Sequence, residues 1–400
     1  MSLRLLLILG ALTAFGPLAT DFYLPSFPTL AKVFSTDIEH IQLSLSAYFI
    51  GLAGGQLLYG PLADRFGRRR PLVFGVALFT LASFACMFVP DLQSLIAVRV
   101  LQALGGCAGV VIARAVVRDL CDPVLTARVF SRLMLVMGLA PILAPLAGGL
   151  LLTHGGWQAI FACLGGISGL CLLAVLFWLP ETRPQDAPPA PLSGALGQYR
   201  HLLADRAFLG HALTGGLAMA AMFAYISGSP FVFIKLYQVP EHAYGWVFGS
   251  NAAGYILMAQ LNARLLRNRG PGFWAPRGVA LLLLCALALF VVALLRPAAL
   301  WPLLIPLFGC ISCLGLVVPN TSACAMSGQH AHAGSASALL GCLQFSIASL
   351  AAALVGVLHD GSALPMAAVM LGCGLAAMLV AGYTARLRPD IAAAVALEKR

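Results

Sequence analysis

Charged residues are scarce in this sequence of 400 residues. Asp, Glu, Lys and Arg together make up 10% of the chain, whereas 60% of it is hydrophobic. So few polar side chains cannot cover the surface of a soluble fold of this size. The composition therefore excludes a soluble globular protein and predicts a chain that crosses the lipid bilayer many times.

Motifs of several other protein classes are missing as well. There is no glycine-rich phosphate loop and no nucleophile beside a base, so we expect neither ATP as the energy source nor an enzyme. The closest cysteines, Cys310 and Cys313, have no second pair and no histidine cluster beside them, so we expect no metal site and no cofactor. No patch of basic and aromatic residues is long enough to bind nucleic acid. A receptor is expected to carry an additional soluble domain, and the sequence shows none.

Apolar runs of about 20 residues, the length that crosses a bilayer, recur along the chain. We expect twelve spans, at residues 5–26, 42–61, 71–90, 93–115, 130–152, 157–180, 207–232, 243–263, 277–296, 300–324, 335–358 and 363–385. A polar, proline-rich stretch at 181–206 follows the sixth span. The prediction is an all-α membrane protein with an N-terminal six-helix half (1–182), a cytoplasmic linker (183–206) and a C-terminal six-helix half with a short cytoplasmic tail (207–400).

The basic residues predict the orientation. Nineteen of the 24 Lys and Arg residues fall on one side of the predicted spans, three fall on the opposite side, and Arg99 and Arg114 lie within a span. By the positive-inside rule the richer side is cytoplasmic. We therefore expect both termini and the linker in the cytoplasm.

Asp21 is the one acidic residue that falls inside a predicted span. An ionisable group in a membrane costs about 2.5–3.5 kcal/mol on insertion scales, so by default it faces a cavity or a partner and serves a function. The alternative is a slightly shorter span that leaves Asp21 among the outer headgroups. We favour the functional interpretation and predict that Asp21 is the proton-coupling group.

Arg99 places a positive charge within the fourth span. A rise of 1.5 Å per residue from arginines on the cytoplasmic side puts Arg99 and Asp21 at similar depths, about 22 and 25 Å. One interpretation is a polar pairing between the two, direct or through water or backbone carbonyls. The other is that the Arg99 side chain extends to the outer surface.

Three stretches have a recognisable spacing of small and charged residues. They read Gly60-Pro-Leu-Ala-Asp64-Arg65-Phe-Gly67-Arg68, Arg99-Val-Leu-Gln102-Ala103, and Gly138-Leu-Ala-Pro141-Ile-Leu-Ala-Pro145-Leu-Ala-Gly148-Gly149. In that order they resemble the loop 2–3, R-x-x-Q-G and antiporter signatures of the major facilitator superfamily. The second departs at Ala103, where glycine is usual.

The resemblance implies roles for these stretches. The loop would be a gate in which Asp64 docks near Gly334 and Ser335 and holds the cytoplasmic side shut; its residues are Gly60, Asp64, Arg65, Gly67 and Arg68. The antiporter motif would let helices approach closely as the protein moves; its residues are Gly138, Pro141, Pro145, Gly148 and Gly149. The simpler alternatives are a positive-inside anchor and ordinary helix packing.

Further stretches narrow the resemblance to the bicyclomycin-resistance (Bcr/CflA) branch of bacterial drug:proton antiporters. They are Thr20–Pro25, Gly54–Gly60, Ala113–Asp119, Gly156–Phe161, Ala224–Val232, Val318–Asn320 and Gly334–Gly341. This branch implies the bacterial inner (cytoplasmic) membrane. Some related exporters carry a second acid two turns before Asp21, where this chain has Thr13.

The leading hypothesis is a monomeric secondary transporter that exports small, mostly apolar drugs in exchange for protons by alternating access. Side chains expected along the substrate pathway are Phe22, Tyr23, Arg99, Gln102, Tyr225, Asn251, Asn320 and Gln344, although a polar side chain in a span is more often an interhelical hydrogen bond. The rival hypothesis is an exporter of an amino acid or another metabolite, or an uptake symporter. A membrane-embedded enzyme or a receptor is the alternative from another class.

Overall fold

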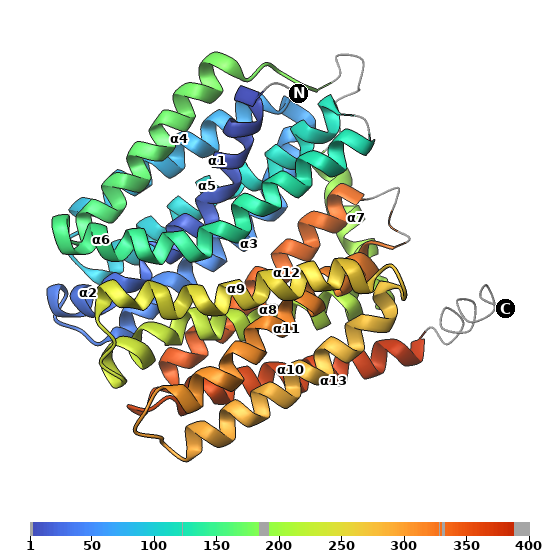
Figure 1. Ribbon diagram of the computed structural model, residues 1–400. Coiled ribbons are helices and arrows are strands. Elements are labelled where there is room, and N and C mark those ends of the chain that lie inside the picture. The colour runs from blue at the N-terminus through green and yellow to red at the C-terminus, as the bar shows by residue number, and fades with distance from the viewer. Residues whose placement is uncertain (1–2, 122, 184–191, 328, 330–332, 388–400) are drawn as a thin grey trace. The chain divides into compact units, whose positions relative to one another are not determined.

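The structure is a computed structural model that describes residues 3–121, 123–183, 192–327, 329 and 333–387. Within this part of the chain every regular element is helical and no strand is present (Figure 1). The all-α prediction is therefore confirmed. The predicted C-terminal tail from residue 388 and residues 184–191 of the predicted linker lie outside the described residues.

The helices follow the predicted spans. The first six spans correspond to α1 (Leu3–Asp21) with η1 (Leu24–Ser26) and α2 (Phe27–Val33), α3 (Ile38–Phe66), α4 (Arg69–Ala85) with η2 (Cys86–Phe88), α5 (Leu92–Leu120), and α6 (Pro123–Trp178). The other elements are α7 (Leu192–Ala204), α8 (Arg206–Pro230) with the π-helical η3 (Phe231–Leu236), α9 (Glu241–Leu265), α10 (Pro271–Leu294), α11 (Trp301–Met326), α12 (Ala333–Val357) and α13 (Leu364–Leu387). The helix α7 lies in the predicted linker, where composition indicated only a polar connection.

In the described residues, ten helices are long and apolar enough to cross a membrane. The number is below twelve for two reasons. The long α6 contains both the fifth and the sixth predicted spans, which meet at a kink where Gly156 has φ 70° and ψ −178°. The helix α9 also coincides with a predicted span, but it is not among the ten apolar helices.

Particular residues end and begin these helices. Gly67 ends α3 with φ 86°, a conformation that favours glycine. Asp91 caps α5, because its carboxylate accepts a hydrogen bond from the Ser94 backbone N–H at 2.8 Å. These residues fix where the turns between spans lie.

The chain divides by contacts into two compact units. The first unit contains Met1–Ala195 and Ser229–Gly249, and the second contains Leu196–Gly228 and Ser250–Arg400. In the first unit α3 and α5 pack tightly, because a Cβ at Gly51 would lie 2.7 Å from the Ala103 Cβ and one at Gly55 would lie 2.6 Å from the Cys107 Cβ. Small residues thus bring the two backbones together.

The second unit uses the same device. The helices α10 and α11 lie against each other, and a Cβ at Gly278 would lie 2.9 Å from Val317 Cγ2. Gly315 of α11 approaches the backbone of α9, where a Cβ would lie 2.7 Å from the Ala259 nitrogen. Glycine therefore sets the helix spacing in both units.

Candidate functional site

Asp21 is the last residue of α1, and only 3% of its surface is exposed. The Thr20 hydroxyl lies 3.0 Å from its Oδ1. The same hydroxyl is within reach of the carbonyl oxygens of Gly16, at 3.2 Å, and Pro17, at 3.0 Å. A hydroxyl carries one proton, so Thr20 can donate to only one of these three acceptors at a time. Its donation to Asp21 therefore competes with donation to the helix backbone.

Arg99 of α5 is completely buried. Its guanidinium carbon lies 4.7 Å from the Tyr23 ring centroid and 4.2 Å from that of Tyr48, within cation–π range. The Phe161 ring lies farther away, at 6.0 Å. The interpretation in which Arg99 reaches the outer surface is therefore wrong, because rings from α3, from α6 and from the turn after α1 surround the charge.

One nitrogen of this guanidinium begins a chain of hydrogen bonds to α4. Arg99 Nη1 donates to Gln102 Oε1 at 2.6 Å, and Gln102 Nε2 donates to the Ser83 hydroxyl at 2.8 Å. Arg99 Nε and Nη2 have no hydrogen-bond partner. Although both residues are described, no ion pair within 4.0 Å joins Arg99 to Asp21. The two charges are therefore not directly paired in this structure.

The antiporter motif lies within α6. A Cβ at Gly148 would meet the Phe22 backbone, its carbonyl oxygen most closely. Gly149 faces α9 of the same unit, where a Cβ would lie 3.1 Å from the Glu241 carbonyl oxygen. Pro141 and Pro145 lie earlier in the same helix. The segment that directly follows Asp21 therefore packs on α6 at a position that only glycine fits.

Gly138 also lies in α6, and the structure describes its backbone but not its burial. Ala103, at the position where glycine is usual, contacts Gly51 across the α3–α5 pair. The departure from the R-x-x-Q-G signature is accommodated because the facing residue has no side chain.

The predicted gating loop centres on Arg68. Its Nη1 lies 2.6 Å from Asp64 Oδ1 and its Nε lies 2.9 Å from Asp119 Oδ2. The Asp64 side chain is 54% exposed, whereas those of Arg68 and Asp119 are 11% and 13% exposed. Burial acts to lower the pKa of Arg68, but the two carboxylates outweigh it and raise that pKa above its ordinary value. The loop thus ties the end of α3 to the end of α5.

Glu181 binds the backbone of the same loop. Its carboxylate accepts hydrogen bonds from the backbone N–H groups of Arg68, at 2.7 Å, and Arg69, at 3.1 Å, where α4 begins, and from those of Thr182 and Arg183, both at 3.1 Å. Partial burial acts to raise the pKa of this carboxyl, but the four donors hold it below its ordinary value. A side chain on Gly67 would collide with the carboxylate.

The other loop residues play smaller parts. The Arg65 guanidinium lies 5.5 Å from the Phe66 ring, and its carbonyl oxygen accepts a hydrogen bond from Arg183. Gly60 lies within α3 with open space beside it, so the tight turn depends on Gly67 and not on Gly60.

Pathway residues predicted for the C-terminal half lie in the second unit. Asn251 donates to the Tyr225 hydroxyl at 3.2 Å, and both are buried. Asn320 and Asn262 exchange amide hydrogen bonds at 2.9 and 3.4 Å, which links α11 to α9. Gln344 is half-buried beside α8. These contacts have the form of interhelical hydrogen bonds.

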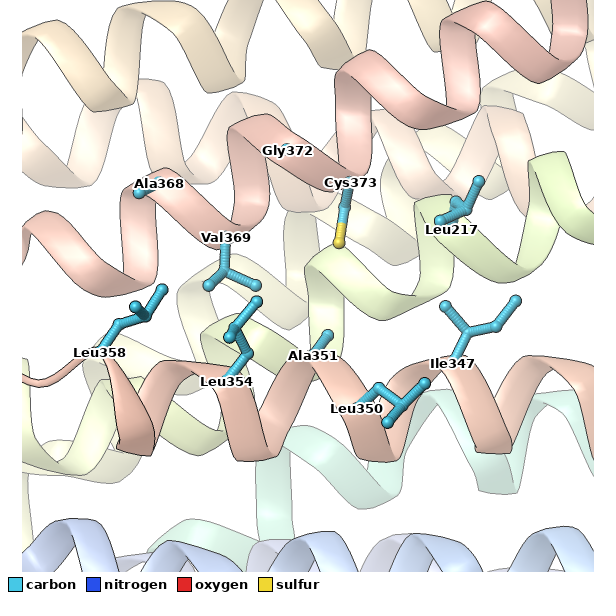
Figure 2. Close-up of a pocket in the computed structure, with 10 residues that line it drawn as sticks. All are labelled: Leu217, Ile347, Leu350, Ala351, Leu354, Leu358, Ala368, Val369, Gly372 and Cys373. Carbon is cyan, nitrogen blue, oxygen red and sulfur yellow. The ribbon is translucent and has the colours of Figure 1, made fainter.

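An apolar groove of about 330 Å³ lies elsewhere in the second unit (Figure 2). Leu354 of α12 and Val369 of α13 point toward each other, and Leu217 of α8 lies to their right in the view of Figure 2. All ten residues that line it are nonpolar apart from Cys373. It contains none of the predicted pathway residues.

Sequence reasoning did not single out several residues of these networks. Asp119 lies at the end of a stretch that resembles the family, and Glu181 lies in the polar stretch after the sixth span. Ser83 belongs to an apolar run and carries no signal of its own, and Phe161 is only the last residue of a stretch that resembles the family. A buried cation is stabilised by hydrogen-bond acceptors and aromatic rings. A search for tyrosines in the spans beside Arg99 is therefore the one approach that could have found Tyr48.

Comparison with known proteins decides the family. Residues 9–353 match the family described as Major Facilitator Superfamily. The chain belongs to this superfamily. It is therefore a multi-pass membrane protein of the twelve-helix fold and a member of a transporter family, not of an enzyme family, as the sequence predicted.

Bacterial relatives match almost the whole chain. The "Uncharacterized MFS-type transporter YdgK" of Bacillus subtilis is 36% identical over 375 residues, 92% of each protein. The "Bicyclomycin resistance protein homolog" of Haemophilus influenzae is 29% identical over 375 residues, 94% of each. Among solved structures, the xylose transporter XylE from E. coli, in a partially occluded inward open conformation, has a TM-score of 0.72 over 96% of this chain and 97% of XylE at 13% identity, a likeness of fold alone.

Proposed function

We propose that this protein exports small, mostly apolar drugs in exchange for protons. The observation that carries the proposal is Asp21, a buried carboxyl in a membrane helix that forms no ion pair with Arg99. A carboxyl without a counter-ion can be neutral or charged, and the change between these forms is what proton coupling requires. The names of relatives, which include bicyclomycin and multidrug resistance proteins, support drugs as the cargo.

The proposed cycle is alternating access. Asp21 takes up a proton from the periplasm, which favours release of the substrate and closure of the outer side. Its deprotonation toward the cytoplasm restores the affinity for substrate. The Phe22 backbone transmits the change, because it follows Asp21 and packs directly on Gly148 of α6.

The remaining parts of the machinery are assigned as proposals. The loop around Arg68 acts as the cytoplasmic gate, and the glycines of the antiporter motif allow α6 to move against its neighbours. We propose that the side chains along the substrate pathway are Phe22, Tyr23, Arg99, Gln102, Tyr225, Asn251, Asn320 and Gln344. Apolar and aromatic side chains among them suit an apolar cargo.

We further propose that the protein works as a monomer in a bacterial inner membrane, with both termini in the cytoplasm. Its two six-helix halves would comprise residues 1–182 and 207–400, with a cytoplasmic linker between them. The excess of arginine on one side of the spans supports this orientation.

Export assays on reconstituted protein test the proposal. Proteoliposomes with an imposed pH gradient should accumulate drugs from a panel of neutral and cationic compounds, and a protonophore should abolish the accumulation. Cells that express the protein should survive the same drugs at higher concentrations. If amino acids are transported and no drug of the panel is, the rival hypothesis of a metabolite exporter takes its place.

A further inference from the structure

The buried guanidinium of Arg99 has one occupied edge and one open edge. Nη1 is engaged by Gln102, whereas Nε and Nη2, whose N–H groups point to the same side, have no partner. The rings of Tyr23 and Tyr48 lie over the guanidinium at 4.7 and 4.2 Å. The group is therefore held in one orientation, with two parallel donors that are left to bind an acceptor.

Two further observations indicate what the acceptor is. The Tyr48 hydroxyl is completely buried and also lacks a hydrogen-bond partner. Within the described part of the chain, no carboxylate forms an ion pair with Arg99. A desolvated cation without a counter-charge is unfavourable in a membrane protein, so an anionic acceptor gains both charge neutralisation and hydrogen bonds.

Two parallel N–H donors match the two oxygens of a carboxylate, which arginine binds through a bidentate fork. A lysine ammonium or a hydroxyl in the place of the guanidinium would not offer two parallel donors. Tyr23, Tyr48 and Phe161 surround the charge with aromatic surface. The combination suits a ligand with a carboxylate at one end and an apolar body.

We propose that the open edge of Arg99 binds the carboxylate of amphipathic organic acids, which are thus a substrate class of this exporter. The inference rests on the proposed export function and names part of its cargo. Because Arg99 is completely buried, the ligand reaches it only when the first unit opens. Binding therefore selects a more open conformation, and the observed affinity is reduced by the fraction of protein in that state.

A matched ligand pair tests this on the purified full-length protein in detergent. The probes are 4-butylbenzoate and 4-butylbenzamide, which share their shape and differ in charge, and their binding is measured by calorimetry. We expect the benzoate to bind about 10- to 100-fold more tightly, the range for charge-assisted hydrogen bonds. Equal affinities overturn the inference, because water or a carboxylate of the protein then satisfies the donors.

Variants locate the effect. Arg99→Lys keeps the charge and removes the fork, so the preference for benzoate over benzamide should fall to a few-fold. Arg267→Lys, at an exposed arginine in the turn that follows α9, is the control and should retain the full preference. An unchanged preference in Arg99→Lys contradicts the inference. Should Arg99→Lys fail to fold, the comparison of the two ligands on the unaltered protein still decides.

The two proposals fail separately. Proton-driven export of neutral drugs without any preference for benzoate removes the carboxylate inference and leaves the exporter. A preference for benzoate that depends on Arg99, in a protein that exports no drug of the panel, removes the drug exporter and leaves the binding site.

Discussion

Gly148 offers the sharpest structural prediction, because Gly149 next to it serves as a matched control. A Cβ at Gly148 would lie 2.9 Å from the Phe22 carbonyl carbon and Cα, and closer still to the carbonyl oxygen. Carbon atoms in contact are normally about 3.5–4.0 Å apart, so the backbone at Phe22 and the backbone of α6 would have to separate by roughly 0.5–1 Å. We therefore expect Gly148→Ala to cost about 1–3 kcal/mol, the usual range for overpacking.

Gly149→Ala adds the same methyl group in a roomier place. Its nearest neighbours would be the Glu241 carbonyl oxygen at 3.1 Å and the His242 Cα at 3.3 Å, so a shift of a few tenths of an ångström relieves the contact. We expect a cost below about 1 kcal/mol.

The assay pairs thermal unfolding in detergent with proton-driven export in proteoliposomes, at equal protein levels. Gly148→Ala should melt lower and export more slowly than Gly149→Ala, because the displaced segment follows Asp21. If the two variants were equally stable and equally active, the close contact between Phe22 and Gly148 would matter neither for stability nor for export.

Three further predictions concern packing and the cytoplasmic loop. Gly55→Ala should cost about 1–3 kcal/mol of stability, because its Cβ would lie 2.6 Å from the Cys107 Cβ. Adding Cys107→Gly to this variant should recover most of the stability, whereas adding Cys107→Ala should not. If the two second changes had the same effect, the predicted contact between these residues would be wrong. Glu181→Gln should lower the melting temperature near pH 7, because a carboxyl with a lowered pKa stabilises the fold only while it is ionised. The difference in melting temperature between the variant and the unaltered protein should shrink as the pH falls below about 4.5. A difference that does not vary with pH refutes this. Asp64→Asn should change stability by less than about 1 kcal/mol, since the carboxylate paired with Arg68 is exposed, yet slow export several-fold; transport at the unaltered rate argues against a gate.

Much of the fold was predictable because hydropathy and span length are strong signals in membrane proteins. Every predicted span coincides with a helix. The signals fail where a local feature decides. Gly156 gives no sign in the sequence that two spans meet at a kink within one long run, and the helical part of the linker, α7, was hidden by its polar composition.

The site was predictable only one residue at a time. The cost of a charge in a membrane singled out Asp21 and Arg99, and the small residues singled out Gly148. Which side chains meet depends on how helices turn toward one another, and spacing along the chain does not contain that information. Only the three-dimensional structure shows that Tyr48 packs on Arg99 and that Glu181 binds the backbone of the loop.

Asp21→Asn tests whether Asp21 carries the coupled proton. The change imitates the protonated carboxyl, and because no ion pair with Arg99 is lost, the variant should fold normally. In proteoliposomes with an imposed pH gradient, we expect uphill drug export to vanish while downhill leakage survives. Asp37→Asn, in an exposed acid whose side chain makes no capping hydrogen bond, should export at the unaltered rate. Intact uphill export by Asp21→Asn would mean that another group carries the coupled proton.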